Sequence, residues 1–234
     1  GVVPKGGPVI VGEPSMMQTV TGHKGGQGFD THVIGFEVHS SILNVGVSAI
    51  LEGVKIIDFA NQRNATAFAS EPTALGAMFD PPVTTWHVGQ VSGGTAHNIT
   101  AKDCWFSMDF RAVPGDDVAA LKRDYLDHVA KIEAGMQAVH PDARVEIETR
   151  FYVPPLTPEK DGIAEALVRQ ITGDNGNHVV SYGTEAGQFQ AVGYSAVVCG
   201  PGDIAQAHQP NEFITVAQFD AGHAFMQKLV ARLA

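Results

Sequence analysis

Apolar and polar residues alternate along several segments of the chain, a pattern typical of β-strands with one buried face. The clearest segment is Cys104–Val113, in which Phe106, Met108 and Phe110 alternate with more polar residues. One face of this strand should be buried and the other wetter. Further strands are predicted over Val9–Val11, His32–Val38, Trp86–Val91, Arg144–Phe151 and Ala196–Cys199. Val9–Val11 and Ala196–Cys199 are short apolar runs, which indicate buried strands.

Helical spacing of apolar residues accounts for much of the remaining chain. It predicts a helix over about Gly46–Asn61 and, after a turn and N-cap at Pro114–Asp117, a second helix that ends near Val139. Two further helices are expected at Ile163–Ile171 and Ala217–Leu233.

The order of these elements divides the chain into two kinds of fold. Residues 25–151 follow the β-α-β-β-α-β order of a ferredoxin-like α+β domain, which predicts a four-stranded antiparallel sheet with two helices on one face. Residues 1–24 and 152–234 carry α/β elements instead. We therefore expect an α/β domain that is interrupted by an inserted α+β domain.

Composition narrows the class of protein. Hydrophobic residues make up 44% of the 234 residues and charged residues 17%, which favours a globular protein with a real core. The formal net charge of −10 argues against a nucleic-acid partner. The sequence contains no run of about 18 apolar residues, so it predicts no membrane span. The first residues lack the basic start and long apolar stretch of a signal peptide. Cys104 and Cys199 lie apart in apolar segments, so we expect inert buried thiols and a cytoplasmic location.

The segment Gly200–Glu212 is the richest in candidate chemistry. A buried strand feeds a Gly-Pro-Gly loop, and His208 follows among small and polar residues. A loop just after the carboxyl end of a strand is where α/β folds place their active sites. Taken alone, however, His208 is better explained as a histidine on a surface loop.

Glu13 follows the first predicted strand and precedes Pro14, which favours an extended backbone there. Its carboxylate could ligate a metal ion, although capping a helix or facing solvent is the simpler explanation of such a residue. Glu13 and His208 together supply the oxygen and nitrogen ligands that suit zinc, but two ligands do not make a site.

Polar side chains also stand at strand ends and beside glycines. His39 ends a predicted strand, and Asn98 lies on a loop after Gly93-Gly94, whose glycines permit a tight backbone. Both are therefore candidates for a functional site, although each signal is weak by itself.

Two further candidates lie in the second half of the chain. Arg111 interrupts an apolar strand, where it could pair with a substrate carboxylate or simply with Asp109. Gly183 and Thr184 belong to the glycine-bracketed loop Tyr182–Gly187, in which we expect exposed amides and a hydroxyl.

In this order, these segments resemble the dinuclear metallohydrolases that include acetylornithine deacetylase, succinyl-diaminopimelate desuccinylase, aminoacylase and glutamate carboxypeptidase. The motifs that carry the resemblance span Gly12–Phe213, nearly the whole chain, and are GEPS, HKG, HSS, GGTAHN, DFR, GTEAG and GPGDIAQAHQPNEF. The last motif, together with the GTEAG before it, is the most specific and favours the acetylornithine deacetylase type.

The resemblance implies a reaction, a cofactor and an assembly. The reaction is hydrolysis of the amide bond of a small N-acyl amino acid, and the closest type converts N-acetyl-L-ornithine to L-ornithine and acetate in arginine biosynthesis. Two zinc ions per complete site, with cobalt as a possible substitute, would polarise the amide carbonyl while a glutamate activates the bridging water. The inserted domain, residues 25–151, would serve as a lid and form a homodimer.

The resemblance also implies roles for individual residues. Glu13 would ligate one metal ion and His208 the other. His39 would reach the site of the neighbouring subunit and stabilise the oxyanion there. The substrate would be held by Asn98, Arg111, Gly183 and Thr184.

The family's remaining metal ligands and its catalytic base belong to a His-x-Asp motif and a Glu-Glu pair, neither of which is recognised here. His140-Pro141-Asp142 matches the first spacing, but it follows the second helix of the inserted domain and is interpreted as a coincidence. We expect this chain to be the C-terminal two-thirds of such an enzyme, metal-poor and inactive alone. Glu13 and His208 should still lie close together, because the strands before them should end on the same side of one sheet.

Two alternatives stay open. The chain could be a non-catalytic dimerisation or binding module of the same fold, or a relative with another substrate such as succinyl-diaminopimelate. Zinc content would test the first alternative, and hydrolysis rates on a panel of N-acyl amino acids would test the second.

Overall fold

The computed structural model of the chain describes residues 6–233, so residues 1–5 and 234 of the expected α/β segments lie outside the described residues. The chain divides into two compact units. Unit 1 contains the residues up to Gly25, the short segment Met78–Asp80 and the residues from Val153 onward, whereas unit 2 contains Gly26–Ala77 and Pro81–Tyr152. Among the described residues, no helix is long and apolar enough to span a bilayer.

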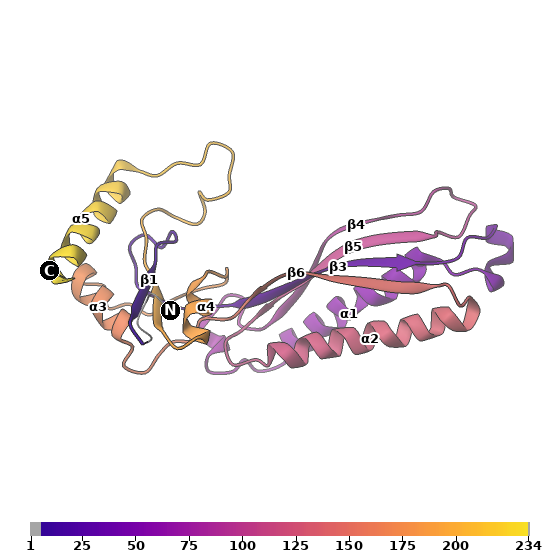
Figure 1. The fold of residues 1–234 in the computed structure, drawn as a ribbon, viewed down its shortest axis with the longest axis horizontal. Coiled ribbons are helices and arrows are strands. Elements are labelled where there is room, and N and C mark those ends of the chain that lie inside the picture. Colours follow the sequence, from indigo (N-terminus) through magenta and orange to yellow (C-terminus); the bar gives the residue numbers. More distant parts are fainter. Residues whose placement is uncertain (1–5, 234) are drawn as a thin grey trace. The chain divides into compact units, whose positions relative to one another are not determined.

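Unit 2 is a four-stranded sheet with two long helices on one face (Figure 1). Its elements follow the order β-α-β-β-α-β along the chain, the strands lie in the order β4-β5-β3-β6, and β4 and β5 are antiparallel. Short 3-10 helices, η1 (Ser40–Val45) and η2 (Gly76–Met78), precede and follow the first long helix. The main elements are β3 (Gly25–Ile34), α1 (Ala49–Ala69), β4 (Thr85–Gly93), β5 (Asp103–Ala112), α2 (Val118–Val139) and β6 (Arg144–Val153).

The core of unit 2 lies between this sheet and the two helices. The alternation predicted for β5 is confirmed, because Cys104, Phe106, Met108 and Phe110 are all buried while the residues between them are more exposed. On α2 the buried Tyr125 packs against them. The helices begin where side-chain caps are available, at Ser48 for α1 and Asp117 for α2, and both caps accept a hydrogen bond from the first turn.

Unit 1 holds a second four-stranded sheet, in the order β1-β8-β2-β7. β1 runs parallel to β8 and β2 runs parallel to β7, whereas β2 and β8 are antiparallel. Its elements are β1 (Pro8–Val11), β2 (Val20–His23), α3 (Ile163–Thr172), β7 (His178–Val180), α4 (Ala186–Ala191), β8 (Ser195–Val198) and α5 (Val216–Leu233).

The two faces of the unit 1 sheet pack against different helices. Ile10 and Val197 belong to an apolar cluster with residues of α3 and α5. Val11 and Val198, one position further along their strands, belong to a separate cluster that includes Ala186 of α4. Because successive residues of a strand point to opposite faces, Val9–Val11 of β1 and Ala196–Val198 of β8 are apolar at every position.

Some expected element bounds are wrong. The strand expected at His32–Val38 is β3, which begins at Gly25 and already ends at Ile34. The helix expected to end near Asn61 continues to Ala69. The strand expected to be buried at Val9–Val11 is only half-buried, because β1 lies at the edge of its sheet.

The glycines at the start of β3 explain the first of these errors. A run of glycines does not look like a strand, because glycine lacks a side chain to pack. Here the packing requires it: a Cβ added to Gly28 would lie 2.5 Å from the ring of Phe151. The glycine therefore admits the aromatic ring of β6 against the backbone of β3.

Candidate functional site

Glu13 and His208 follow neighbouring strands of the unit 1 sheet. β1 and β8 are parallel, with Val11 opposite Val198, so both strands end on the same side, which confirms the prediction about the strands. Beyond them the backbones are in close contact, because a Cβ added to Gly200 would lie 2.5 Å from the Glu13 carbonyl oxygen. Only glycine can occupy that position without displacing the segment that carries Glu13.

Tyr182 holds the backbone beside Glu13. Its hydroxyl donates a hydrogen bond of 2.8 Å to the carbonyl oxygen of Pro14. Burial raises the pKa of Tyr182, and the carboxylates of Glu13 and Asp203 raise it further, so the phenol remains a neutral donor at neutral pH.

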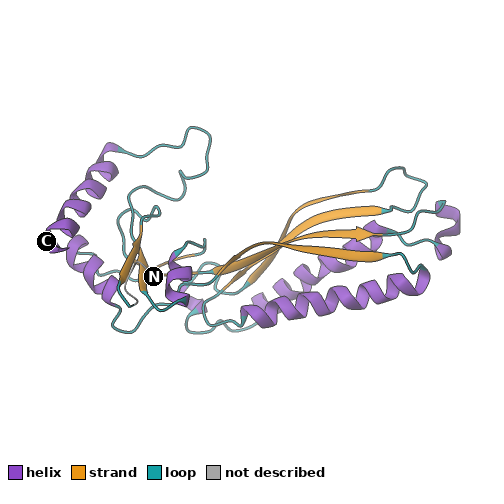
Figure 2. Cartoon of the chain, in the orientation of Figure 1, coloured by secondary structure: helices purple, strands orange, loops and turns teal. Residues whose placement is uncertain are grey.

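His208 stands on the long loop between β8 and α5 (Figure 2). The residue is exposed, its backbone is in the left-handed region at φ 60°, and its amide donates a hydrogen bond of 3.1 Å to the Glu212 carboxylate. Pro14 and Ala207, the chain neighbours of Glu13 and His208, line one cavity of about 300 Å³. The two segments thus share a hollow, and the close approach of the two side chains stays a prediction.

The donor set of this chain does not complete a metal site. Within residues 6–233, no group of three or more His, Cys, Asp or Glu side chains is arranged to hold a metal ion. Zinc sites in proteins normally have at least three protein ligands. Glu13 and His208 therefore fit the chemistry of such a site in type but not in number, and no reaction step can be derived through a metal from these residues alone.

His39 and Asn98 lie side by side in unit 2. The amide of Ser40 donates to the Asn98 carbonyl at 2.9 Å, and His39 forms an isolated β-bridge with Ile99. His39 also caps η1, because its Nδ1 accepts a hydrogen bond of 3.2 Å from the amide of Ser41. The proton of the neutral imidazole is therefore on Nε2, and the residue is exposed.

Arg111 lies at the other end of the same sheet. Its Nε donates to Asp109 at 3.2 Å, as the simpler sequence interpretation expected, and its guanidinium lies 5.5 Å from the centre of the Phe151 ring. Arg111 lies eight positions along β5 from Asp103, the strand end nearest Asn98. At 3.3–3.4 Å per residue this is roughly 27 Å. Arg111 and Asn98 of one chain therefore cannot hold the same small molecule.

Three amides of the Tyr182–Gly187 loop, which the sequence analysis expected to be exposed, are engaged in hydrogen bonds. Those of Thr184 and Gly187 donate to His23, and that of Ala186 donates to the Thr184 hydroxyl oxygen at 3.1 Å. Thr184 is itself buried. The loop is thus shaped by internal hydrogen bonds.

His23 is a functional candidate that sequence reasoning did not assign, although its HKG motif was noted. It is fully buried at the end of β2 and contacts the loop that carries Gly183 and Thr184. A histidine preceded by two buried threonines and a glycine gives no sequence signal of this contact, because its partners lie about 160 residues further along the chain.

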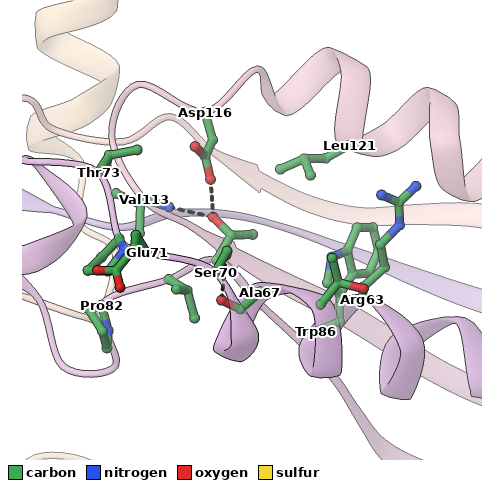
Figure 3. Close-up of a pocket in the computed structure, with 14 residues that line it drawn as sticks. Arg63, Ala67, Ser70, Glu71, Thr73, Pro82, Trp86, Val113, Asp116 and Leu121 are labelled. Carbon is green, nitrogen blue, oxygen red and sulfur yellow. Dashed lines mark hydrogen bonds between the residues drawn. The ribbon is translucent and has the colours of Figure 1, made fainter.

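A surface cavity of about 240 Å³ lies in unit 2 (Figure 3). It is lined by Trp86 and by residues from the end of α1 and the start of α2. The Thr84 hydroxyl donates to Asp116 and accepts from the amide of Val113 along its wall. None of the site residues predicted from the sequence lines this cavity.

Comparison with protein families identifies one matching model, described as a peptidase dimerisation domain, over residues 21–137. Among curated proteins, an acetylornithine deacetylase from Myxococcus xanthus is 30% identical over 229 residues, which cover 95% of this chain and 56% of that protein. One from Yersinia pestis is 31% identical over 231 residues, covering 94% of this chain and 54% of that protein. The chain thus spans about half the length of the curated relatives it matches.

Solved structures share the fold. An aminopeptidase from Bacillus cereus superposes with a TM-score of 0.69 at 16% identity, covering 95% of this chain and 55% of that chain. An amidase of the hydantoinase/carbamoylase family from Burkholderia vietnamiensis gives a TM-score of 0.60 at 22% identity, covering 88% and 47% respectively. Identities this low bear on the fold alone.

Proposed function

The chain belongs to the family of the peptidase dimerisation domain, and on that premise we propose that it is part of a metal-dependent amidohydrolase acting on an N-acyl amino acid. The favoured substrate is N-acetyl-L-ornithine, hydrolysed to L-ornithine and acetate in the cytoplasm as a step of arginine biosynthesis. One observation carries this proposal: proteins named acetylornithine deacetylase match 94–95% of the chain at about 30% identity.

We propose separate roles for the two units. Unit 1 is part of the catalytic α/β domain, and unit 2 is an inserted ferredoxin-like lid that forms a homodimer. The β-α-β-β-α-β order and the strand order β4-β5-β3-β6 support the assignment of unit 2. The matched family model, which covers most of unit 2, supports its role in dimerisation.

The dimer contact is proposed to involve β4 and α1. β4 is an edge strand, with one row of backbone groups free to pair with a second copy. Large apolar side chains are exposed on both elements: Leu51 and Val54 on α1 at 54% and 55%, and Val91 on β4 at 63%. A two-fold contact through such an edge is self-complementary, the commonest arrangement of homodimers.

The separation of Arg111 from Asn98 supports a site built from two protomers. His39 and Asn98 lie together, and Arg111 lies roughly 27 Å away along β5. All three can serve one small substrate only if His39 and Asn98 come from the partner copy. In this assembly, the Nε2–H group of His39 donates a hydrogen bond to the developing oxyanion and so stabilises it. Asn98 and Arg111 bind the polar ends of the substrate.

Glu13 and His208 are proposed as ligands of two zinc ions, with cobalt as an alternative metal. When bound, such a pair of ions polarises the amide carbonyl and supplies an activated water. The shared hollow beside Pro14 and Ala207 supports their convergence. Gly183 and Thr184 are proposed to line the substrate side of unit 1.

The experiment that tests this function is hydrolysis of an N-acyl amino acid panel by the full gene product, with zinc or cobalt supplied. We expect the highest kcat/KM for N-acetyl-L-ornithine, and loss of hydrolysis in His208→Ala without loss of the fold. Absence of hydrolysis on the whole panel, in a protein that carries no zinc, would favour the alternative of a non-catalytic dimerisation or binding module. A preference for N-succinyl-diaminopimelate would assign a different acyl group to the same chemistry.

A further inference from the structure

Both ring nitrogens of His23 are engaged in hydrogen bonds. The residue ends β2 and is 0% exposed. Its Nδ1 lies 2.9 Å from the carbonyl oxygen of Lys24. Its Nε2 lies 3.4 Å from the amide nitrogen of Thr184 and 3.2 Å from that of Gly187. The imidazole therefore joins β2 to the loop that leads into α4.

These partners allow only one protonation state of the ring. A carbonyl oxygen only accepts, so Nδ1 must carry a proton and donate it to Lys24. An amide N–H only donates, so Nε2 must present a lone pair to Thr184 and Gly187. In the charged imidazolium both nitrogens are donors, and the new Nε2–H would face two other donors.

We propose that His23 is a positioning residue, which holds the Tyr182–Gly187 loop in place while it is neutral and releases the loop when it is protonated. The inference deepens the proposed function, and rests on it, because this loop carries the proposed substrate-binding residues Gly183 and Thr184. Loss of the two hydrogen bonds at acidic pH therefore weakens substrate binding through the loop, without any change at Glu13 or His208.

The surroundings of His23 set the pH range. Burial lowers the pKa of His23 below its ordinary value of 6.5, while the Lys24 carbonyl and the negative charge of Glu185 oppose this effect. Other charged or titratable groups near β2 are the buried Lys24 directly after His23, His178 on β7 with its partner Asp174, Tyr182 on the loop, and Glu159 near Leu156. The loop is thus held at neutral pH and is released only below the usual range of a histidine.

Nuclear magnetic resonance of the histidine rings and the backbone amides tests the proposal directly. We expect the His23 ring, identified by the signals lost in His23→Gln, to be neutral with its proton on Nδ1 at pH 7.5. As the pH falls through its titration, the protection factors of the Thr184 and Gly187 amides, which compare their exchange with the intrinsic rate at the same pH, should fall about tenfold, the effect of losing a hydrogen bond. A proton on Nε2 at pH 7.5, or unchanged protection factors while the ring titrates, would overturn it.

Two substitutions of His23 distinguish the loss of its hydrogen-bond acceptor from the protonation of its ring. In His23→Gln the side-chain oxygen can accept from both amides but cannot be protonated, so their protection should persist at acidic pH. In His23→Leu the acceptor is lost, and the amides should exchange fast at every pH. If the leucine variant fails to fold, the glutamine variant still decides. The control is His128→Gln on α2, whose ring contacts the Lys55 carbonyl and which should leave both amides unchanged.

The outcome can be distinguished from a failure of the proposed function. The ring state and amide exchange are measured without substrate, so they stand even if no N-acyl amino acid is hydrolysed. Where hydrolysis is observed, His23→Gln should flatten the acid-side rise of KM and leave kcat near the wild-type value. An unchanged acid-side rise of KM in His23→Gln would contradict the link between the loop and the substrate.

Discussion

Asp174 connects three segments of unit 1 through its carboxylate. It accepts hydrogen bonds from the amides of Thr19 and Gly176, at 2.7 and 2.9 Å, and from the ring of His178 at 3.1 Å. Burial alone would raise the pKa of Asp174, but these hydrogen bonds and the charge of His178 lower it to about 2. The charged carboxylate is therefore favoured by the folded state over the unfolded one.

Replacing this carboxylate should cost stability in a way that depends on pH. A folded pKa below the unfolded one gives stability that is present above the unfolded value, near 3.8, and is lost as the pH falls through about 2. Asp174→Asn should lower the free energy of unfolding by about 2 kcal/mol at pH 7, measured by urea denaturation. The deficit should shrink toward pH 2. Asp142→Asn, on an exposed turn, is the control, and an equal loss in both variants would contradict the account.

The two cysteines provide a second residue-scale prediction. Burial raises the pKa of the Cys199 thiol to about 11, and also raises that of Cys104. Because the thiolate is the reactive form, neither side chain should react with a disulfide reagent in the native protein at pH 8. Both should react within seconds once urea unfolds the chain. Rapid labelling of the native protein would contradict this prediction and show that one of the two thiols is open to solvent.

At the scale of elements, sequence predicted best where packing is regular. β5 and α2 could be predicted because each buries one continuous face. Apolar residues alternate with polar ones on the strand and recur at helical spacing on the helix. The first half of β3 was not, because its glycines are dictated by the ring of Phe151. β2 and β7 are only four and three residues long, which is too short for a periodic signal.

Glycine positions test this packing account. A Cβ added to Gly35, just after β3, would lie 2.1 Å from the Val47 carbonyl oxygen, so Gly35→Ala should lower the free energy of unfolding by about 2 kcal/mol or more. Gly135 on α2 is exposed and has no atom within 4 Å of such a Cβ. Gly135→Ala should instead raise stability by about 0.5–1 kcal/mol, since alanine is the better helix former. Thermal unfolding should show Gly35→Ala to be less stable and Gly135→Ala to be more stable than the wild type. Equal changes in the two variants would contradict this account.

The candidate site was predictable only in part. Motif order pointed to Glu13, His39, Asn98 and His208, which all stand on loops or strand ends. The sequence could not show that His23 and Tyr182 hold the loops of unit 1, because each does so through a backbone group more than 150 residues away. Long-range contacts of this kind leave no local pattern.

At the scale of the whole molecule, the proposed dimer is open to test. Leu51→Glu with Val54→Glu places two charges on the exposed apolar side of α1, where burial against a second copy would desolvate them. We expect sedimentation to show a dimer for the wild type and a monomer for the double variant. Leu126→Glu on α2, an exposed apolar position away from β4, should remain dimeric. A wild type that stays monomeric at high concentration would rule out the proposed contact.

The central claim, an amidohydrolase site shared between two protomers, is tested most directly by mixing two inactive variants of the full gene product. His39→Ala removes the proposed oxyanion donor and Arg111→Ala the proposed substrate clamp. Random pairing makes about half of the dimers mixed, each with one intact site of two. The account predicts hydrolysis of N-acetyl-L-ornithine at about a quarter of the wild-type rate after the variants are mixed and allowed to exchange subunits. A mixture no more active than either variant alone, with mixed dimers demonstrably formed, would contradict it.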